Sequence, residues 1–348
     1  MFASHADYAR LEEDARRVLD PAVFDFYAGG SGDETTLAAA AAAWRRIPLR
    51  PHVLRDVSAV DTRVRVLGHD LATPVGVAPV GYQSLAHPGG ELATARGARR
   101  AGALLTLSSR SSRRIEEVAA EAGPWWFQAY VLRDRGLTRE LAYRAAGAGA
   151  SAVVLTGDTP YLGRRRRDRD PGLIPDDVFG VNLAHGFDRS LAEQAADVTY
   201  DDIAWLAELS GLPVVVKGVL RGDDARDCAA AGASAVWVSN HGGRQLDGAV
   251  TTARALPEVA AAVRGAVEVY ADGGIRTGVD VLRALALGAR AVFVGRPMLW
   301  CLATGGQNAV AGGLAELSDG LAHAMGLAGV TKVSQIDQGL CDPQAAGE

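Results

Sequence analysis

Eight short apolar runs, spaced along the chain from residue 73 onward, constrain the fold more than any other feature of the sequence. Each run is continuously apolar rather than alternating, which is typical of strands buried on both faces of a parallel sheet. The runs are TPVGVAP, ALLTLSS, WWFQAYV, AVVLTGD, PVVVKGV, AVWVSNH, EVYADGG and AVFVGRP. A chain with these strands needs further elements to cover both faces of its sheet.

The segments between the runs provide that cover. They carry apolar residues at helical spacing and often end in glycine, the usual end of a helix, as in GGELATARGARRAG, DDARDCAAAGA and TGVDVLRALALGA. Eight alternations of strand and helix predict an α/β fold of the TIM (β/α)8 barrel type. An open, doubly wound sheet is the weaker alternative, because it rarely needs eight such even repeats.

Two segments depart from the repeat. We expect a single domain in which residues 1–72 form an N-terminal helical cap with a capping strand, residues 73–328 the barrel and residues 329–348 a C-terminal tail. The gap after the fourth strand, about residues 159–212, is much longer than the others. Such a long loop is usually functional or mobile, and on a barrel it would overhang the end that carries the active site.

Composition excludes several classes of protein. No apolar run approaches the length of a membrane span, and the N-terminus has no secretory h-region. Cys228, Cys301 and Cys341 are far apart and favour neither disulfides nor a metal site, so a reducing cytoplasm is the expected location. A net charge of −5 argues against a nucleic-acid partner. The basic run RRRRDRD, residues 164–170, needs a separate explanation.

Polar side chains gather at the predicted C-terminal ends of six consecutive strands, where a (β/α)8 barrel carries its catalytic residues. They are Gln128, Tyr130, Thr156, Asp158, Lys217, His241, Asp272 and Arg296. A single residue of this kind is more often a solvated loop residue. Their joint occurrence at one end of the predicted barrel favours an active site.

The last two strand ends predict a phosphate site. ADGGIRTG (271–278) and VGRP (294–297) combine glycines with Arg276 and Arg296. Loops after strands seven and eight recurrently bind phosphate in these barrels, and backbone amides at a helix start favour an anion. The residues alone leave open a lyase or isomerase with Lys217 as a Schiff base, a flavin enzyme, and a barrel that binds without catalysis.

Several motifs closely resemble those of the FMN-dependent α-hydroxy acid oxidase and dehydrogenase family, over nearly the whole chain. They are SNHGGRQLDG, VKGV, DTPYLGRR, YAGGSGDE and DGGIRTGVDVLRALALGARAVFVGRP. The resemblance implies FMN as cofactor and oxidation of an (S)-2-hydroxy acid to a 2-oxo acid. It implies dioxygen or another electron acceptor, such as a quinone or a carrier protein, and a homo-oligomer (a tetramer or an octamer).

The resemblance also implies how the cofactor is held. The backbone of Ala78, Pro79, Val80 and Gly81 would lie against flavin N5, and Lys217 would lie beside N1 and O2, where negative charge develops on reduction. The flavin ring would accept or donate hydrogen bonds at Ser108, Gln128 and Thr156. The ribityl chain and phosphate would contact Asp272, Gly273, Gly274, Arg276, Gly295 and Arg296.

For catalysis, the resemblance implies that His241 is the base that takes a proton from the substrate, a role suited to an imidazole. Asp158 would hydrogen-bond this imidazole, and Tyr130 the reacting oxygen. Arg244 and Arg165 would clamp the substrate carboxylate, a planar pairing suited to guanidinium. Within the basic run this explains Arg165, and we expect its neighbours Arg164, Arg166 and Arg167 to form a solvated loop face.

Three positions depart from the glycolate oxidases of the family. Phe26 replaces a tyrosine that helps to hold the carboxylate, Gly81 replaces a common alanine, and Arg110 replaces a tryptophan that walls a small pocket. Phe26 and the APVGYQ segment resemble the 4-hydroxymandelate oxidases, so we expect an aryl substrate such as mandelate or 4-hydroxymandelate. Arg110 either faces inward and selects a second anionic group, or pairs with an acidic residue at the pocket rim.

Overall fold

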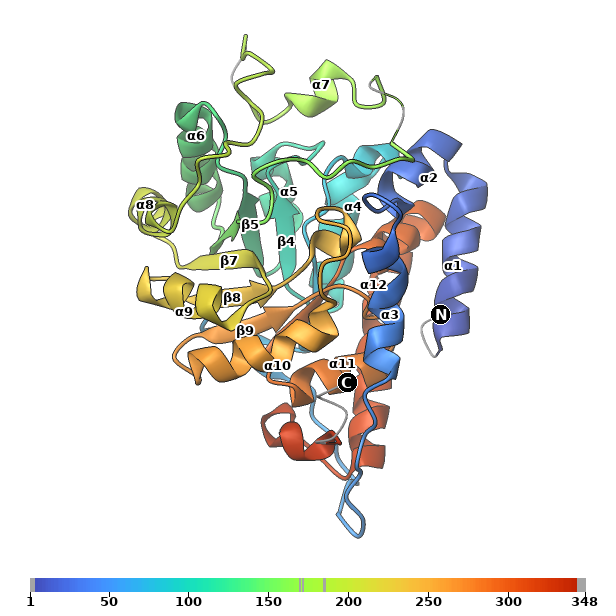
Figure 1. Cartoon of the computed structure of the whole chain (residues 1–348). Helices are drawn as coiled ribbons and strands as arrows, with labels where there is room; N and C mark the ends of the chain where they lie inside the picture. Colours follow the sequence, from blue (N-terminus) through green and yellow to red (C-terminus); the bar gives the residue numbers. More distant parts are fainter. Residues whose placement is uncertain (1–3, 169, 171, 184–185, 343–348) are drawn as a thin grey trace.

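Eight parallel strands close into a barrel in the computed structural model, which describes residues 4–168, 170, 172–183 and 186–342 (Figure 1). Around the barrel the strands follow the order β10-β3-β4-β5-β6-β7-β8-β9, so that chain neighbours are spatial neighbours. They are β3 (Val75–Val77), β4 (Leu105–Ser108), β5 (Trp125–Ala129), β6 (Val153–Thr156), β7 (Val214–Val219), β8 (Ala235–Val238), β9 (Glu268–Ala271) and β10 (Ala291–Val294). The predicted TIM (β/α)8 barrel is confirmed.

Each strand is followed by a helix that covers the outside of the barrel. These helices are α4 (Gly90–Arg100), α5 (Ile115–Glu121), α6 (Arg135–Gly147), α8 (Asp201–Ser210), α9 (Gly222–Ala230), α10 (Thr252–Val263), α11 (Gly278–Ala286) and α12 (Arg296–Ala328). Because α8 lies inside the predicted gap 159–212, the overhanging loop is shorter than predicted and ends near residue 200.

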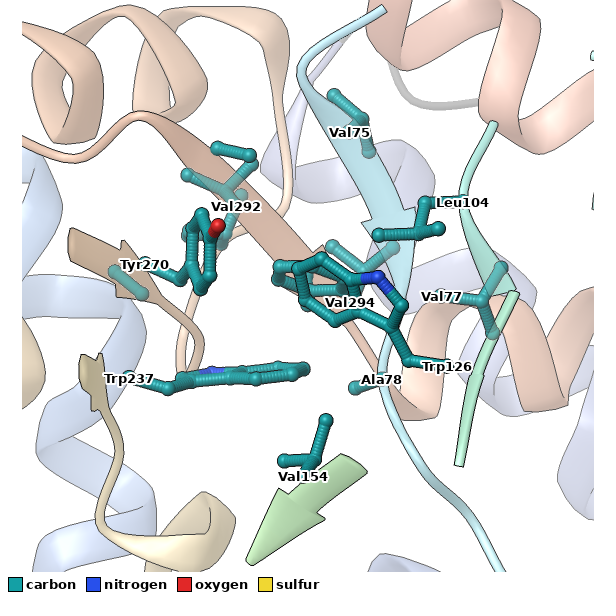
Figure 2. Packing of buried hydrophobic residues seen from close by; sticks show 14 of the residues in the cluster. Val75, Val77, Ala78, Leu104, Trp126, Val154, Trp237, Tyr270, Val292 and Val294 are labelled. Carbon is teal, nitrogen blue, oxygen red and sulfur yellow. The ribbon is translucent and has the colours of Figure 1, made fainter. Parts of the chain in front are cut away.

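Aromatic side chains fill the interior of the barrel. Figure 2 shows Trp126, Tyr270 and Trp237 gathered between the strands, with valines of β3, β6 and β10 around them. The rings of Trp237 and Phe293 have centroids 4.0 Å apart, and those of Trp126 and Tyr270 5.3 Å apart. The interior is therefore a packed floor rather than a pore, and a ligand must bind above it, at the strand ends.

The N-terminal segment packs against one side of the barrel, beside α12 (Figure 1). It contains α1 (His5–Val18), α2 (Pro21–Ala28) and α3 (Thr35–Arg45). Instead of the single capping strand that we expected, it forms an antiparallel hairpin of β1 (Val64–Val66) and β2 (His69–Leu71). The two-residue turn explains the difference, because Gly68 takes the left-handed conformation (φ 84°) that such tight hairpins require.

The loop after β6 carries one short helix, α7 (Asp176–Phe179), at the top of Figure 1. Two contacts fix the loop to the barrel. The amide of Arg133 donates to the Glu193 carbonyl (2.9 Å), and the Asn182 side-chain carbonyl accepts from the Ile115 amide (2.9 Å). The described part of this loop is thereby held over the ends of β4 and β5.

After α12 the chain forms two short turns, η3 (Val333–Gln335) and η4 (Gln338–Leu340), and Cys341 pairs with Leu49 in an isolated bridge. Residues 343–348 of the predicted tail and residues 1–3 of the predicted cap lie outside the described residues. Within the described ranges, no helix combines the length and the apolar character needed to cross a membrane.

Candidate active site

One cavity of about 420 Å³ opens at the C-terminal ends of the barrel strands. Every site residue predicted from the sequence lines it except Asp158, which lies behind His241. The sequence reasoning missed the part of the lining that comes from α2, the turn after β3 and the overhanging loop, namely Tyr27, Tyr82, Leu162, Asp168, Ile174, Phe179, Arg189, Glu193 and Gln194. Only the length of that loop signalled its involvement.

His241 and Asp158 form a hydrogen-bonded pair beside this cavity. His241 begins the short turn η2 (His241–Gly243) directly after β8, and its Nδ1 lies 3.0 Å from Oδ1 of Asp158. Since a carboxylate can only accept, Nδ1 carries the proton and Nε2 is left as the acceptor. Gly218 makes room for this pair, because a Cβ at that position would lie 2.5 Å from the Cβ of Asp158.

Burial lowers the pKa of His241, against the opposing effect of the Asp158 carboxylate. The nearby cations Lys217 and Arg244 lower the pKa of His241 further. The imidazole is therefore neutral at neutral pH and able to accept a proton, as a general base must be. Asp158 would stabilise the imidazolium that forms when the proton arrives.

Lys217 is a buried cation at the end of β7. Its Nζ donates to Ser239 Oγ (2.8 Å) and lies 3.3 Å from Oδ2 of Asp272, above the ring of Trp237. Burial alone would lower the pKa of Lys217, but Asp272 and Asp158 outweigh it and the pKa is raised. A Schiff-base lysine needs a lowered pKa, so this geometry argues against the lyase or isomerase alternative.

A row of buried polar side chains crosses three neighbouring strands at the same level. Ser108 Oγ donates to Oε1 of Gln128 (3.0 Å), and Nε2 of Gln128 donates to Thr156 Oγ1 (2.9 Å). The strand register pairs Ser108 with Gln128 and Thr156 with Lys217, whereas Gln128 pairs with Val154 and its side chain reaches Thr156, two residues further along β6. Polar groups at fixed positions against an apolar floor suit a flat heterocyclic ring.

The segment from Ala78 to Gly81 follows β3, the strand beside β4, and forms another wall of the cavity. Its carbonyls are held from outside, because Gln83 Nε2 donates to Val80 (3.1 Å) and the Tyr27 hydroxyl donates to Gly81 (3.2 Å). A Cβ on Gly81 would lie only 2.9 Å from the Cβ of Arg110. The space beside this glycine is therefore taken by Arg110.

The anion end of the cavity lies where two helices begin. α11 starts with a capping box between Thr277 and Asp280, and α12 starts at Arg296. The Arg276 guanidinium stacks 4.1 Å from the Tyr8 ring, and its buried Nε has no partner in the described part of the chain. Two helix N-termini and an unpartnered guanidinium nitrogen suit a phosphate.

Arg296 has an additional role that the sequence did not predict. Its guanidinium donates to the carbonyls of Tyr27 (2.9 Å), Gly242 (2.9 Å) and Gly29 (3.0 Å). Burial lowers its pKa to about 10, which leaves it charged at neutral pH. Arg296 therefore joins the end of α2 to the turn that carries His241, besides facing the anion end.

Arg244 and Arg165 are two further buried arginines of the cavity, and both lie near Tyr130. The Nη1 of Arg244 donates to the carbonyls of Phe26 (2.7 Å) and Gly29 (2.9 Å), and the side chain lies over the Phe26 ring. Burial lowers the pKa of both arginines, because it disfavours their charged form. A bound carboxylate would offset this desolvation cost.

The rest of the basic run connects the loop to the cap. Arg166 lies 2.6 Å from Asp33 and is largely exposed, but Arg167 is half-buried and pairs with Glu34 and, at 3.8 Å, with Asp25. The prediction of a solvated loop face is therefore wrong for Arg167. The sequence could not show this, because its acidic partners are more than a hundred residues away in the chain.

Comparison with known proteins agrees with this site. The family model described as FMN-dependent dehydrogenase matches residues 15–343. The chain is 46% identical to an L-lactate oxidase of Nostoc sp., covering 94% of this chain and 95% of the relative. It is 46% identical to the 4-hydroxymandelate oxidase of Amycolatopsis orientalis, covering 95% and 96%. A crystal structure of mandelate oxidase superposes with a TM-score of 0.90 at 46% identity, covering 96% and 97%.

The residues present fit the cofactor of that family. The buried cation Lys217, the polar row on β4 to β6 and the unpartnered Nε of Arg276 are the groups that a flavin ring and its phosphate would satisfy. Among the described residues there is no cluster of three or more side chains that could hold a metal ion. With fold, site and relatives in agreement, the chain belongs to the FMN-dependent dehydrogenase family and takes FMN as its cofactor.

Proposed function

We propose that this protein oxidises an aryl (S)-2-hydroxy acid to the 2-oxo acid, with FMN as the redox cofactor and dioxygen as the electron acceptor that leaves as hydrogen peroxide. The observation that carries the proposal is the convergence, in one cavity, of a neutral His241 with a free Nε2 and two buried arginines. The relatives include a 4-hydroxymandelate oxidase, and the structures include mandelate oxidase with (S)-4-hydroxymandelic acid.

In this proposal His241 takes the proton of the substrate hydroxyl as the α-hydrogen leaves with its electron pair. Bound FMN supplies the two-electron acceptor for that hydride. In the rival account His241 takes the α-proton itself, and the residues needed are the same. Asp158 holds Nδ1 and stabilises the resulting imidazolium, and Tyr130 hydrogen-bonds the reacting oxygen.

Arg244 and Arg165 hold the substrate carboxylate. Because Nη1 of Arg244 is occupied by the carbonyls of Phe26 and Gly29, its remaining N–H groups are available to the substrate in a fixed orientation. A hydrogen-bond donor that is already fixed contributes more to substrate binding than a mobile one, since less conformational entropy is lost on binding. The end of α2 thereby orients the carboxylate and places the α-carbon near His241.

For the cofactor, we propose that Ser108, Gln128 and Thr156 contact the ring and that the backbone of Ala78 to Gly81 lies against its reactive edge. Lys217 would stabilise negative charge as it develops on the ring. The ribityl and phosphate contacts fall to Asp272, Gly273, Gly274, Arg276, Gly295 and Arg296. All of these residues line the cavity.

The aryl preference rests on the walls of the substrate end. Phe26 and Tyr82 have ring centroids 6.5 Å apart, and Tyr82 and Phe179 are likewise 6.5 Å apart, with Leu162 and Ile174 beside them. Burying an aromatic ring against such a wall favours binding by about 1.5–3 kcal/mol. Glycolate and lactate offer no group of this size.

A kinetic panel tests this proposal. Purified FMN-loaded protein is reduced anaerobically with glycolate, L-lactate, (S)-mandelate, (S)-4-hydroxymandelate and 2-hydroxyglutarate, and kcat/KM is then measured in air with peroxide detection. We expect the aryl substrates to exceed glycolate by about tenfold or more, from the burial of the ring. If glycolate or lactate has the highest kcat/KM, the aryl assignment fails. Peroxide below stoichiometry, with faster turnover on a quinone, overturns dioxygen as acceptor.

We further propose that cap, barrel and tail act as one FMN-binding domain that assembles into a homo-oligomer in the cytoplasm. The cap packs on α12, and all three cysteines are buried thiols, as is usual in a reducing compartment. Light scattering of the purified protein measures the assembly, and a monomeric mass at micromolar concentration contradicts it.

A further inference from the structure

Arg110 is fixed at the rim of the substrate end, directly after β4. Its backbone amide donates to Ser108 Oγ (3.1 Å) and its carbonyl accepts from the Tyr82 amide (2.8 Å). Its guanidinium donates through Nη2 to the carbonyl of Ala192 and lies 4.6 Å from the centre of the Phe179 ring. These backbone and side-chain contacts together hold Arg110 in one orientation, in which it lines the cavity.

Four arginines that line this cavity have no carboxylate partner in the described part of the chain: Arg110, Arg244, Arg276 and Arg296. The proposed function supplies anions for three of them, namely the cofactor phosphate and the substrate carboxylate. Arg110 remains without one. The acidic partner at the rim that the sequence allowed is not present among the described residues.

The other charges at the rim do not neutralise Arg110. Glu193 also lines the cavity, but it lies 3.1 Å from Arg133. Arg189 stacks on the same Phe179 ring, 4.3 Å from its centre, and is paired with Asp176. The rim therefore has a net positive charge beside an aromatic wall, and neither Nε nor Nη1 of Arg110 has an acceptor in the described chain.

Arg110 also lies close to the reacting end of the cavity. Burial raises the pKa of Tyr130, and Arg110 and Arg165 are both near enough to oppose this rise. A continuous row of aromatic rings joins Arg244 to Arg110. Arg244 lies over the Phe26 ring, Phe26 neighbours Tyr82, Tyr82 neighbours Phe179, and Arg110 lies over Phe179. The side chain of a substrate anchored at Arg244 would follow this row toward Arg110.

We propose that Arg110 forms a second anion subsite, and that the substrate is an aryl 2-hydroxy acid with an anionic group, such as a carboxylate, at the far end of its ring. This inference rests on the proposed function, which provides the first anchor. A guanidinium held beside a ring, with N–H groups left for a ligand, suits a planar carboxylate. Gly81 is needed for this position of Arg110, because a Cβ on residue 81 would displace the Arg110 side chain.

The test compares two ligands that differ only in the second anion. Benzoylformate and 4-carboxybenzoylformate are titrated into FMN-loaded wild type, Arg110→Met and Arg110→Lys by calorimetry, and (S)-mandelate is compared with (S)-4-carboxymandelate in anaerobic flavin reduction. We expect wild type to favour the doubly charged ligand by about 10- to 100-fold, from a charge-assisted hydrogen bond. Arg110→Met should abolish this preference and Arg110→Lys retain part of it.

Arg113→Met is the matched control, because Arg113 lies in the same turn but donates to the Pro88 carbonyl and does not line the cavity. Its preference should equal that of wild type. Equal affinities for both ligands in wild type, or an unchanged preference in Arg110→Met, overturn the proposed subsite. If mandelate is still oxidised in that case, the proposed function is unaffected. If no 2-hydroxy acid reduces the flavin of wild type, the proposed function itself fails. Strongest turnover of 2-hydroxyglutarate, lost in Arg110→Met, supports the subsite and overturns the aryl ring.

Discussion

The two sides of the cavity are built in different ways. The cofactor side consists of strand ends, where Ser108, Gln128, Thr156 and Lys217 occupy neighbouring positions set by the register of β4 to β7. The substrate side consists of α2, the turn after β4 and the overhanging loop, which meet through side chains such as Arg110 and Arg167. The first side is positioned by backbone hydrogen bonds, and the second by contacts between distant segments.

This difference indicates where specificity can change. A residue at a strand end cannot move without disrupting the barrel, so the positions of the groups at the cofactor side are preserved as long as the fold is preserved. A residue held by a loop contact can be exchanged at little cost to stability. Arg110 and Phe26, two of the three positions at which we expect a departure from glycolate oxidases, lie on the substrate side, and the third, Gly81, lies next to Arg110 in the segment proposed to contact the flavin.

The largest effect should come from removing the base at the strand end. His241→Ala deletes the group that we propose takes the proton but leaves the cofactor side intact, so we expect FMN to stay bound. Flavin reduction in anaerobic stopped flow should slow by about 10²–10⁴-fold, the usual value of general base catalysis. Reduction at close to the wild-type rate would show that another group is the base.

The phosphate end should show the next largest effect. Arg276→Ala removes a guanidinium whose buried Nε has no partner among the described residues, and a charge-assisted hydrogen bond to the phosphate would be worth roughly 1.5–3 kcal/mol. We therefore expect the Kd for FMN, measured by fluorescence titration of the apoprotein, to rise by at least about tenfold. Arg290→Ala is the control, because Arg290 donates to the Arg65 carbonyl and does not line the cavity. A variant that retains FMN as tightly as this control contradicts the placement of the phosphate.

The acidity of His241 provides a third test. Because burial lowers its pKa, the imidazole stays neutral as the pH falls through 6.5, and activity declines only below its lowered pKa. In Asp158→Asn the carboxylate that favours the imidazolium is absent, so the acidic limb of kcat/KM should move to lower pH and the plateau should drop by about 10–100-fold. An acidic limb that moves to higher pH would show that Asp158 does not stabilise the cation.

The barrel and the strand-end residues could be predicted because both follow from periodicity. Eight apolar runs predict the strands. The residue after each run lies at the same end of the barrel, regardless of the length and conformation of the loop that follows. The site residues that were missed, such as Phe179 and Arg189, lie in a loop without periodicity. The bonds from Arg296 to the carbonyls of Gly29 and Gly242 depend on how the cap docks, and local sequence holds no signal for that.

The smallest effect should come from the tie between the overhanging loop and the cap. Arg167 pairs with Glu34, whose other oxygen accepts from the Gly30 amide (2.9 Å), next to the Gly29 carbonyl that holds Arg244. Arg167→Ala should therefore loosen both the loop and the anchor of Arg244. The pair is partly exposed and worth about 0.2–1 kcal/mol, so KM should rise by only about two- to fivefold, with faster hydrogen exchange in the loop. Arg166→Ala, which removes a far more exposed ion pair, is the control and should alter both quantities less. Identical exchange and KM in the two variants would mean that the substrate side does not depend on this tie, and that the Arg133 amide and the Asn182 side chain hold the loop without it.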